Sequence, residues 1–161
     1  MTNTKLKILL FAVLILILIP INPSVNASLG QFQISHSIFE LILSSRQRII
    51  QTIKIKNMGD EALNLVAKTK DWYVDNNGDL QLIAPASLSR SASNWIRFNP
   101  KKIKIEPGKT QFIRFSITAP PDNHQPGEYR TSILLTSQEK YTTTNAEFQI
   151  QPQFAILVYV N

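Results

Sequence analysis

The sequence contains no cysteine, which excludes disulfides, zinc–thiolate sites and thiol chemistry. Histidine is scarce as well: of two residues, His36 falls in a strand-like segment and His124 in a proline-rich loop. Neither has the pattern of partners that a catalytic triad or a metal site requires. Charged residues make up only 17% of the chain and hydrophobic residues 43%, a balance that argues against long disordered tracts. We therefore expect a folded, non-enzymatic protein with no cofactor and no bound metal.

No apolar run is long enough to span a membrane as a helix. The longest, residues 8–19, has 12 residues, whereas a helix that crosses a hydrocarbon core needs about 20. Two lysines precede this run, prolines end it, and small residues follow at 25–27. This order is typical of a secretory signal peptide, with an uncleaved amino-terminal anchor as the alternative. We expect residues 1–27 to be the signal peptide and residues 28–161 to form one domain outside the cytoplasm.

The acidic side chains of Asp71, Asp75 and Asp79 are spaced by four residues around the loop at 75–79. The loop sequence DNNGD resembles part of a calcium-binding loop, but it lacks the closing glutamate, and no helical pattern flanks it. An Asn-Gly pair between two strand-like runs is more typical of a hairpin turn. The pattern favours a hairpin whose acids keep the loop soluble over a metal site or a shared-proton pair.

What the sequence has in abundance is alternation of apolar and polar residues, the pattern of strands with one buried face. The alternation is clearest in residues 109–119 and 128–137, each of which follows a Pro-Gly turn. It is weaker in residues 31–43, 48–56 and 62–73. No internal repeat separates these segments, and the chain is long enough to bury one proper core. The pattern predicts an all-β sandwich.

Basic residues recur in pairs two residues apart, which places each pair on one face of its strand. The pairs are Arg46/Arg48, Lys54/Lys56, Lys68/Lys70 and Lys102/Lys104. One interpretation is a solvated sheet face that also discourages aggregation at edges. The other is attraction to an anionic partner such as a cell-envelope polymer. Nucleic acid is not expected as a partner, because no aromatic residues interleave with the basic ones.

The last strand-like segment, residues 145–160, is unusually long, since its residues at about 3.3 Å each would span roughly 50 Å. Apolar side chains occupy every second position: Ala146, Phe148, Ile150, Pro152, Phe154, Ile156, Val158 and Val160. Because proline cannot donate to a ladder, the strand should lie at an edge or break at Pro152. Two interpretations of the apolar face remain open: it packs into the core of this domain, or it is presented to a partner.

Several segments carry a family resemblance. They are residues 53–60, 90–96, 106–109, 113–115, 126–129 and 156–160. They include Asn94-Trp95-Ile96 and the two Pro-Gly turns, at Pro107 and Pro126, that precede strands. Together they resemble the amino-terminal domain of the bacterial periplasmic pilus-assembly chaperones over essentially all of the mature chain. The resemblance implies an immunoglobulin-like (PapD-like) Greek-key sandwich of about seven antiparallel strands.

In that family the last strand of this domain lends alternate apolar side chains to an incomplete pilin subunit, which is a form of β-strand addition. The resemblance therefore implies a strand-pairing peptide site formed by Phe148, Ile150, Pro152, Phe154 and Ile156. Two features depart from the family. No residues follow Asn161 to build a second immunoglobulin-like domain, and the arginine and lysine that anchor the subunit's terminal carboxylate are missing at 35–37 and 153–155.

We expect an exported chaperone-like binding domain, periplasmic or at the surface of a bacterial cell. It would engage an extracytoplasmic protein client, such as a pilus or fimbrial subunit, by β-strand pairing. The alternative function is that of a structural or surface-interaction β-sandwich domain that binds an anionic cell-envelope polymer, weakly, through its paired basic residues.

Overall fold

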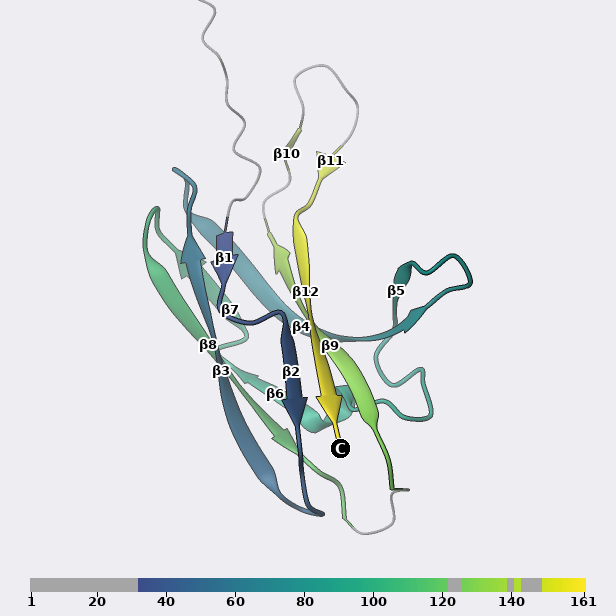
Figure 1. The fold of residues 1–161 in the computed structure, drawn as a ribbon. Coiled ribbons are helices and arrows are strands. Elements are labelled where there is room, and N and C mark those ends of the chain that lie inside the picture. Colours follow the sequence, from purple (N-terminus) through teal and green to yellow (C-terminus); the bar gives the residue numbers. More distant parts are fainter. Residues whose placement is uncertain (1–31, 122–125, 139–140, 143–148) are drawn as a thin grey trace, which may run out of the picture.

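The computed structural model describes residues 32–121, 126–138, 141–142 and 149–161, so the predicted signal peptide at 1–27 lies outside the described residues. Within these ranges the chain forms two β-sheets that face each other (Figure 1). The expected all-β, immunoglobulin-like sandwich is confirmed. No helix in the described ranges is both long and apolar enough to cross a membrane.

The first sheet has four strands, in the order β1 (Phe32–Ile34), β3 (Arg48–Asn57), β8 (Thr110–Thr118) and β6 (Ile96–Asn99). The second sheet has the order β2 (Ile38–Leu41), β12 (Gln153–Val160), β9 (Tyr129–Ser137), β4 (Leu63–Val74) and β5 (Leu80–Ile83), with β7 (Lys102–Ile105) also paired to β4. A short 3-10 turn, η1 (Ser93–Trp95), leads into β6. The strands β10 (Tyr141–Thr142) and β11 (Gln149–Ile150) pair with each other beyond the end of the second sheet.

The chain changes sheets between β1 and β2, which divides the strand region predicted at 31–43 into two. β1 pairs antiparallel with β3 in the first sheet, whereas β2 pairs parallel with β12 in the second. Two backbone bonds fix the change: Ser35 N donates to Lys54 O (3.0 Å), and Leu157 N donates to Ser37 O (2.9 Å). The parallel pair was not predicted from the sequence, because the switch joins segments that are distant in the chain.

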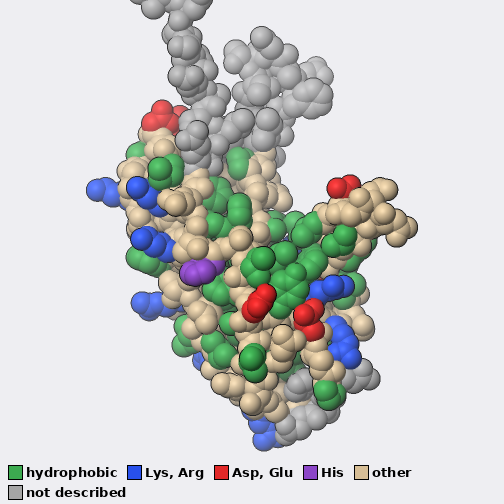
Figure 2. Space-filling model, viewed as in Figure 1, with side chains coloured by type: hydrophobic (Ala, Val, Ile, Leu, Met, Phe, Trp, Pro, Cys, Tyr) green, Lys and Arg blue, Asp and Glu red, His purple; other side chains and the backbone are tan. Residues whose placement is uncertain are grey.

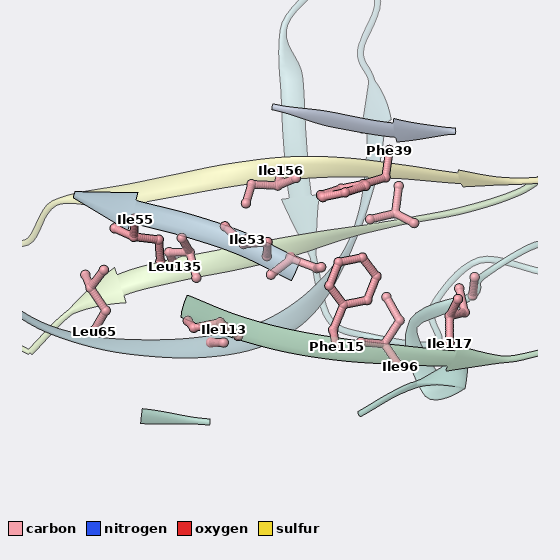
Figure 3. Packing of buried hydrophobic residues seen from close by; sticks show 14 of the residues in the cluster. Phe39, Ile53, Ile55, Leu65, Ile96, Ile113, Phe115, Ile117, Leu135 and Ile156 are labelled. Atoms are coloured by element: carbon pink, nitrogen blue, oxygen red, sulfur yellow. The ribbon is translucent and has the colours of Figure 1, made fainter. Parts of the chain in front are cut away.

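The core lies between the two sheets and is built from the alternate residues of the facing strands (Figure 3). Ile53 of β3, Ile113 of β8, Ile133 of β9 and Ile156 of β12 all have no exposed surface. Phe39 and Phe115 meet edge to face in this layer, with ring centroids 5.1 Å apart. Burial of each large aliphatic or aromatic side chain contributes about 1.5–3 kcal/mol, so this alternation is the main source of stability.

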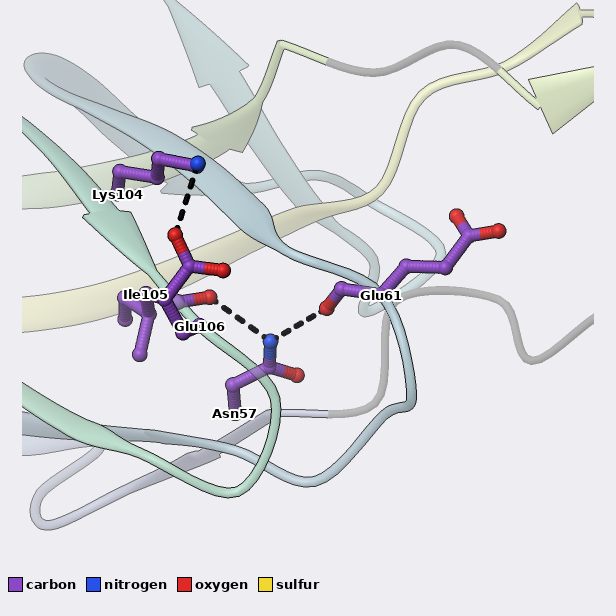
Figure 4. Close-up of polar contacts among 5 residues, drawn as sticks. All are labelled: Asn57, Glu61, Lys104, Ile105 and Glu106. Atoms are coloured by element: carbon purple, nitrogen blue, oxygen red, sulfur yellow. Dashed lines mark hydrogen bonds and ion pairs between the residues drawn. The ribbon is translucent and has the colours of Figure 1, made fainter.

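Asn57 ties one end of the sandwich together across the two sheets (Figure 4). It is 2% exposed, and its Nδ2 donates to Glu61 O (2.6 Å) and Ile105 O (2.9 Å) while its Oδ1 accepts from Gly59 N (2.9 Å). Asn57, at the end of β3 in the first sheet, thus satisfies backbone groups of the following turn and of β7 in the second sheet. The nearby pair of Lys104 Nζ and Glu106 Oε1 (2.8 Å) is largely exposed, so it adds little stability.

The loop at 75–79 is the hairpin turn that joins β4 to β5, as the Asn-Gly signal predicted. Gly78 has a φ of +88°, a conformation that favours glycine. The Asp75 carboxylate accepts the N–H groups of Asn77 (2.9 Å) and Asp79 (3.0 Å) and the amide of Gln81 (2.8 Å). No group of three or more metal-ligating residues occurs in the described part of the chain.

These bonds make the Asp75 loop sensitive to acid. The bond from the Asp79 backbone, followed by that from Gln81, lowers the pKa of the Asp75 carboxyl below its ordinary value. Because the folded-state pKa is depressed, the stabilisation is present above the unfolded-state pKa and is lost as the pH falls through the folded-state pKa. We expect an NMR titration of Asp75 to give a midpoint below that of a solvated aspartate, and Gln81→Ala to raise this midpoint. A midpoint that Gln81→Ala leaves unchanged would contradict the assignment.

Candidate strand-pairing edge

One edge of β12 is only half covered. β9 pairs with β12 along the whole of Gln153–Val160. On the other side, β2 pairs only with the residues from Leu157 to Val160. Among the described residues, no strand therefore pairs with residues 153–156 on this side, and β12 presents a free edge there (Figure 1).

The backbone bonds show which groups point to this free edge. The carbonyl of Pro152 accepts from Ser137 N in β9 (3.0 Å), whereas Leu157 N donates to the chain just ahead of β2 (2.9 Å). Since successive backbone groups of a strand point to opposite sides, even-numbered residues bond to β9 and odd-numbered residues face the β2 side. The N–H and C=O of Gln153 and Ala155 therefore point to the free edge, where an added strand would bond to them.

The predicted site residues fall into different environments. Ile156 is fully buried and belongs to the core, as do its alternate neighbours Val158 and Val160. For Ile156, the structure therefore matches the interpretation that the apolar face packs into this domain. Phe154 is only partly buried: it packs against the core cluster, and its ring lies edge to face with that of Phe32, with centroids 6.1 Å apart.

The other three predicted residues lie at or beyond the start of β12. Pro152 is half-buried and separates β11 from β12, so the long strand breaks where the proline predicted. Ile150 lies in β11, where it pairs with Tyr141 of β10. Phe148 lies outside the described residues. The candidate strand-pairing edge consists of residues 153–156 of β12 and begins directly after Pro152.

An apolar patch covers the outer face of the second sheet beside this edge, which the sequence analysis did not predict as a site. Figure 2 shows hydrophobic side chains gathered across this face. Ile38 of β2 is 49% exposed, and Val74 and Leu80 at the β4–β5 hairpin are 55% and 42% exposed. Between them, the rings of Trp72 and Tyr159 pack edge to face at 5.6 Å. Trp72 itself is only 5% exposed, and the Arg130 guanidinium lies over its ring at 5.0 Å from the centroid, so the exposed apolar surface belongs to the flanking residues. Exposed apolar surface of this kind commonly marks an interaction site.

Residues 35–37, which cross from the first sheet to the second, lie beside the free edge of β12. They include no arginine or lysine. His36 is exposed, its Nδ1 lies 2.9 Å from Ser35 Oγ, and its ring lies 5.3 Å from that of Phe39. A shallow hollow of about 210 Å³ next to the switch is instead lined by Lys54 and Lys56 of β3. These two lysines alternate with the buried Ile53 and Ile55, so they lie on the outer face of the first sheet and not on the β12 edge.

No family model and no curated protein matches this sequence. Solved structures do match it by fold. The class 5 fimbriae chaperone CfaA is 13% identical with a TM-score of 0.54, and the match covers 80% of this chain and 55% of that one. The E. coli chaperone DraB is 10% identical with a TM-score of 0.51 over 81% of this chain and 55% of that one. A Salmonella enterica structure of SafA pilin in complex with the SafB chaperone gives 9% identity and a TM-score of 0.54 over 82% of this chain and 54% of that one.

The fold is PapD-like. The chain spans about half the length of the chaperone chains that it matches. At these identities the likeness concerns the fold, and the resemblance inferred from the sequence motifs agrees with it. In this PapD-like domain, β12 is the last strand, so the free edge lies on the strand that the resemblance had singled out.

Proposed function

We propose that this PapD-like domain is an exported, non-enzymatic, chaperone-like binding module. It engages an extracytoplasmic protein, such as a pilin-like subunit, through β-strand pairing at residues 153–156 of β12. The observation that carries the proposal is the free edge, at which the backbone groups of Gln153 and Ala155 have no paired strand among the described residues. A client strand there would extend the second sheet by one strand.

The apolar patch supports the same mode of binding. A strand added at the free edge would continue the sheet beside Ile38, the exposed apolar residue of β2. Main-chain bonds to an edge give affinity with little sequence preference, so side-chain contacts must supply the specificity. The half-buried Phe154 lies on the strand that carries this edge and is the described residue available for such contacts, whereas Ile156 acts through its position in the core.

Two solved structures of similar fold contain a chaperone together with another protein, which supports a protein client. The SafB structure contains a pilin, and a further match at 13% identity and a TM-score of 0.54 is described as a chaperone–tip adhesin complex. This chain differs from the pattern of the pilus chaperones because residues 35–37 and 153–155 contain neither the arginine nor the lysine that would bind a terminal carboxylate. We therefore propose that the register of the client strand along β12 is not set by a terminal carboxylate bound at those positions.

Replacement of Ala155 by proline tests the proposal. The N–H of Ala155 points to the free edge, so Ala155→Pro removes a donor for an added strand without removing a bond to β9. We expect this variant to fold and to lose capture of its client, measured by photo-crosslinking from position 153 in cell-envelope extracts. Ala155→Val is the matched control, because it keeps the N–H and should retain the crosslinked product.

The comparison has two outcomes that would contradict the proposal. One is an equal yield of the same crosslinked protein from Ala155→Pro and Ala155→Val. The other is an equal yield when the crosslinker is moved to exposed Thr118 on the first sheet, since that face has no part in strand pairing. A thermal melt of Ala155→Pro establishes that any loss of capture occurs in the folded protein.

A further inference from the structure

A basic cleft lies at the opposite edge of the second sheet from β12. It has a volume of about 660 Å³ and is formed where β4 runs between its two short partners. β7 pairs with Leu63–Val66 and β5 with Asp71–Val74, so residues 67–70 of β4 have no strand partner on this side within the described ranges. β6 and η1 form the opposite wall.

Four cations line this cleft and no acid does: Lys68 and Lys70 come from β4, Arg97 from β6, and Lys101 from the turn after β6. None of the four forms an ion pair with any residue in the part of the chain that the structure describes. Like charges gathered in a concavity repel one another and concentrate a positive potential there. The cleft therefore has the electrostatics of an anion site.

The walls orient one of the cations and one backbone donor. The Nη1 of Arg97 donates to the carbonyls of Asn94 and Ile96, each at 2.9 Å, which leaves the rest of the guanidinium to donate elsewhere. Ala67 N donates to Lys101 O (2.9 Å), so backbone alternation turns the N–H of Thr69 toward the same open side of β4. The cleft thus offers an arginine fork, three ammonium groups and a backbone donor.

We propose that this cleft binds a phosphate-bearing ligand. A phosphate group on an ester carries up to about two negative charges and three strong acceptor oxygens, so it matches a dense cluster of cations better than a single carboxylate does. Arginine bonds phosphate in a bidentate manner, and lysines add point charges around it. Both a small oligophosphate and a phosphate-bearing polymer supply this chemistry. The site is separate from the strand-pairing edge and does not depend on the function proposed for it.

Calorimetric titration of the protein with inorganic tripolyphosphate, a glycerol-phosphate polymer and polyglutamate tests this assignment. We expect Lys70→Gln combined with Arg97→Gln to weaken tripolyphosphate binding at least about tenfold, because each lost charge-assisted hydrogen bond costs roughly that factor. Lys54→Gln combined with Arg114→Gln removes the same two residue types from the exposed outer face of the first sheet. That control should weaken binding less than about twofold, as expected for distant, screened charges.

Binding of tripolyphosphate alone would identify a free oligophosphate as the ligand source, and binding of both phosphate probes would identify the polymer. Polyglutamate binding as tight as that of the phosphate probes would overturn the proposal, as would equal weakening by the two double variants.

Amide chemical shifts of the unmodified protein give a second measurement that needs no variant. With tripolyphosphate they should move in residues 67–70 and 94–98 and stay constant in 53–56; movement confined to other strands would also overturn the proposal.

Discussion

Ile156→Glu should unfold the domain. Ile156 has no exposed surface and lies in the core opposite the strands of the first sheet, so a glutamate there would bury a charge without a partner (Figure 3). Burial of an unpaired charge together with loss of a large aliphatic side chain should lower the free energy of unfolding by about 4 kcal/mol or more. That is nearly the whole stability of a domain at the lower end of the usual range, about 5 kcal/mol. Circular dichroism and urea denaturation would measure the loss.

Gln153→Glu is the matched control, because it puts the same side chain on the exposed start of the same strand. A surface substitution of this kind should change the free energy of unfolding by no more than about 0.5 kcal/mol. A folded and equally stable Ile156→Glu protein would show that the alternate apolar face of β12 is not core. The position of the free edge would then need revision as well.

Asp71→Ala should cost about 3 kcal/mol of stability and release the loop that follows β5. Asp71 is fully buried, and its carboxylate accepts the N–H groups of Ser87 (2.8 Å) and Leu88 (3.0 Å) and the hydroxyl of Ser91 (2.6 Å). Removal of this acceptor leaves three donors without their charged partner, each of which costs about 1–3 kcal/mol when buried. Chemical denaturation would measure the stability, and hydrogen exchange at Ser87 and Leu88 would report on the loop.

Asp79→Ala provides the comparison, since Asp79 is exposed at the hairpin tip. It should leave the free energy of unfolding within about 0.5 kcal/mol of the unmodified protein. If the two alanine variants were equally stable, Asp71 would not be the anchor of the loop. Because that loop supplies part of the wall of the basic cleft, Asp71→Ala should also weaken tripolyphosphate binding.

The pattern of residues close together in the sequence was sufficient to predict many of the strands and turns of the sandwich. Alternation predicted β8 and β9 most clearly and β3 more weakly, and Asn77-Gly78 predicted the hairpin between β4 and β5. Pro152 predicted the break before β12, since proline lacks the N–H that a continuous ladder would use. These features depend on residues close together in the chain, so the sequence alone carries them.

The features that depend on distant contacts were not predicted. The interpretation of Asp71 as a loop-solubilising acid was wrong, because its burial results from a loop some 16 residues later that folds back onto β4. Likewise, Lys68 and Lys70 were recognised as a pair, but the cleft that they share with Arg97 and Lys101 depends on the turn after β6, where Lys101 O accepts from Ala67 N of β4. The half-covered edge of β12 arises from the sheet switch between β1 and β2, which alternation does not reveal.

Amide hydrogen exchange along β12 in the isolated protein tests the central claim most directly. Ala155 N–H should exchange rapidly because it faces the free edge, whereas Leu157 N–H should be protected by its bond to Ser37 and Phe154 N–H by its pairing with β9. The account predicts this alternation from Gln153 to Ile156 and its disappearance beyond Leu157. Protection of Ala155 as strong as that of Leu157 would mean that the edge is already occupied, and strand pairing with a client would have no place to occur.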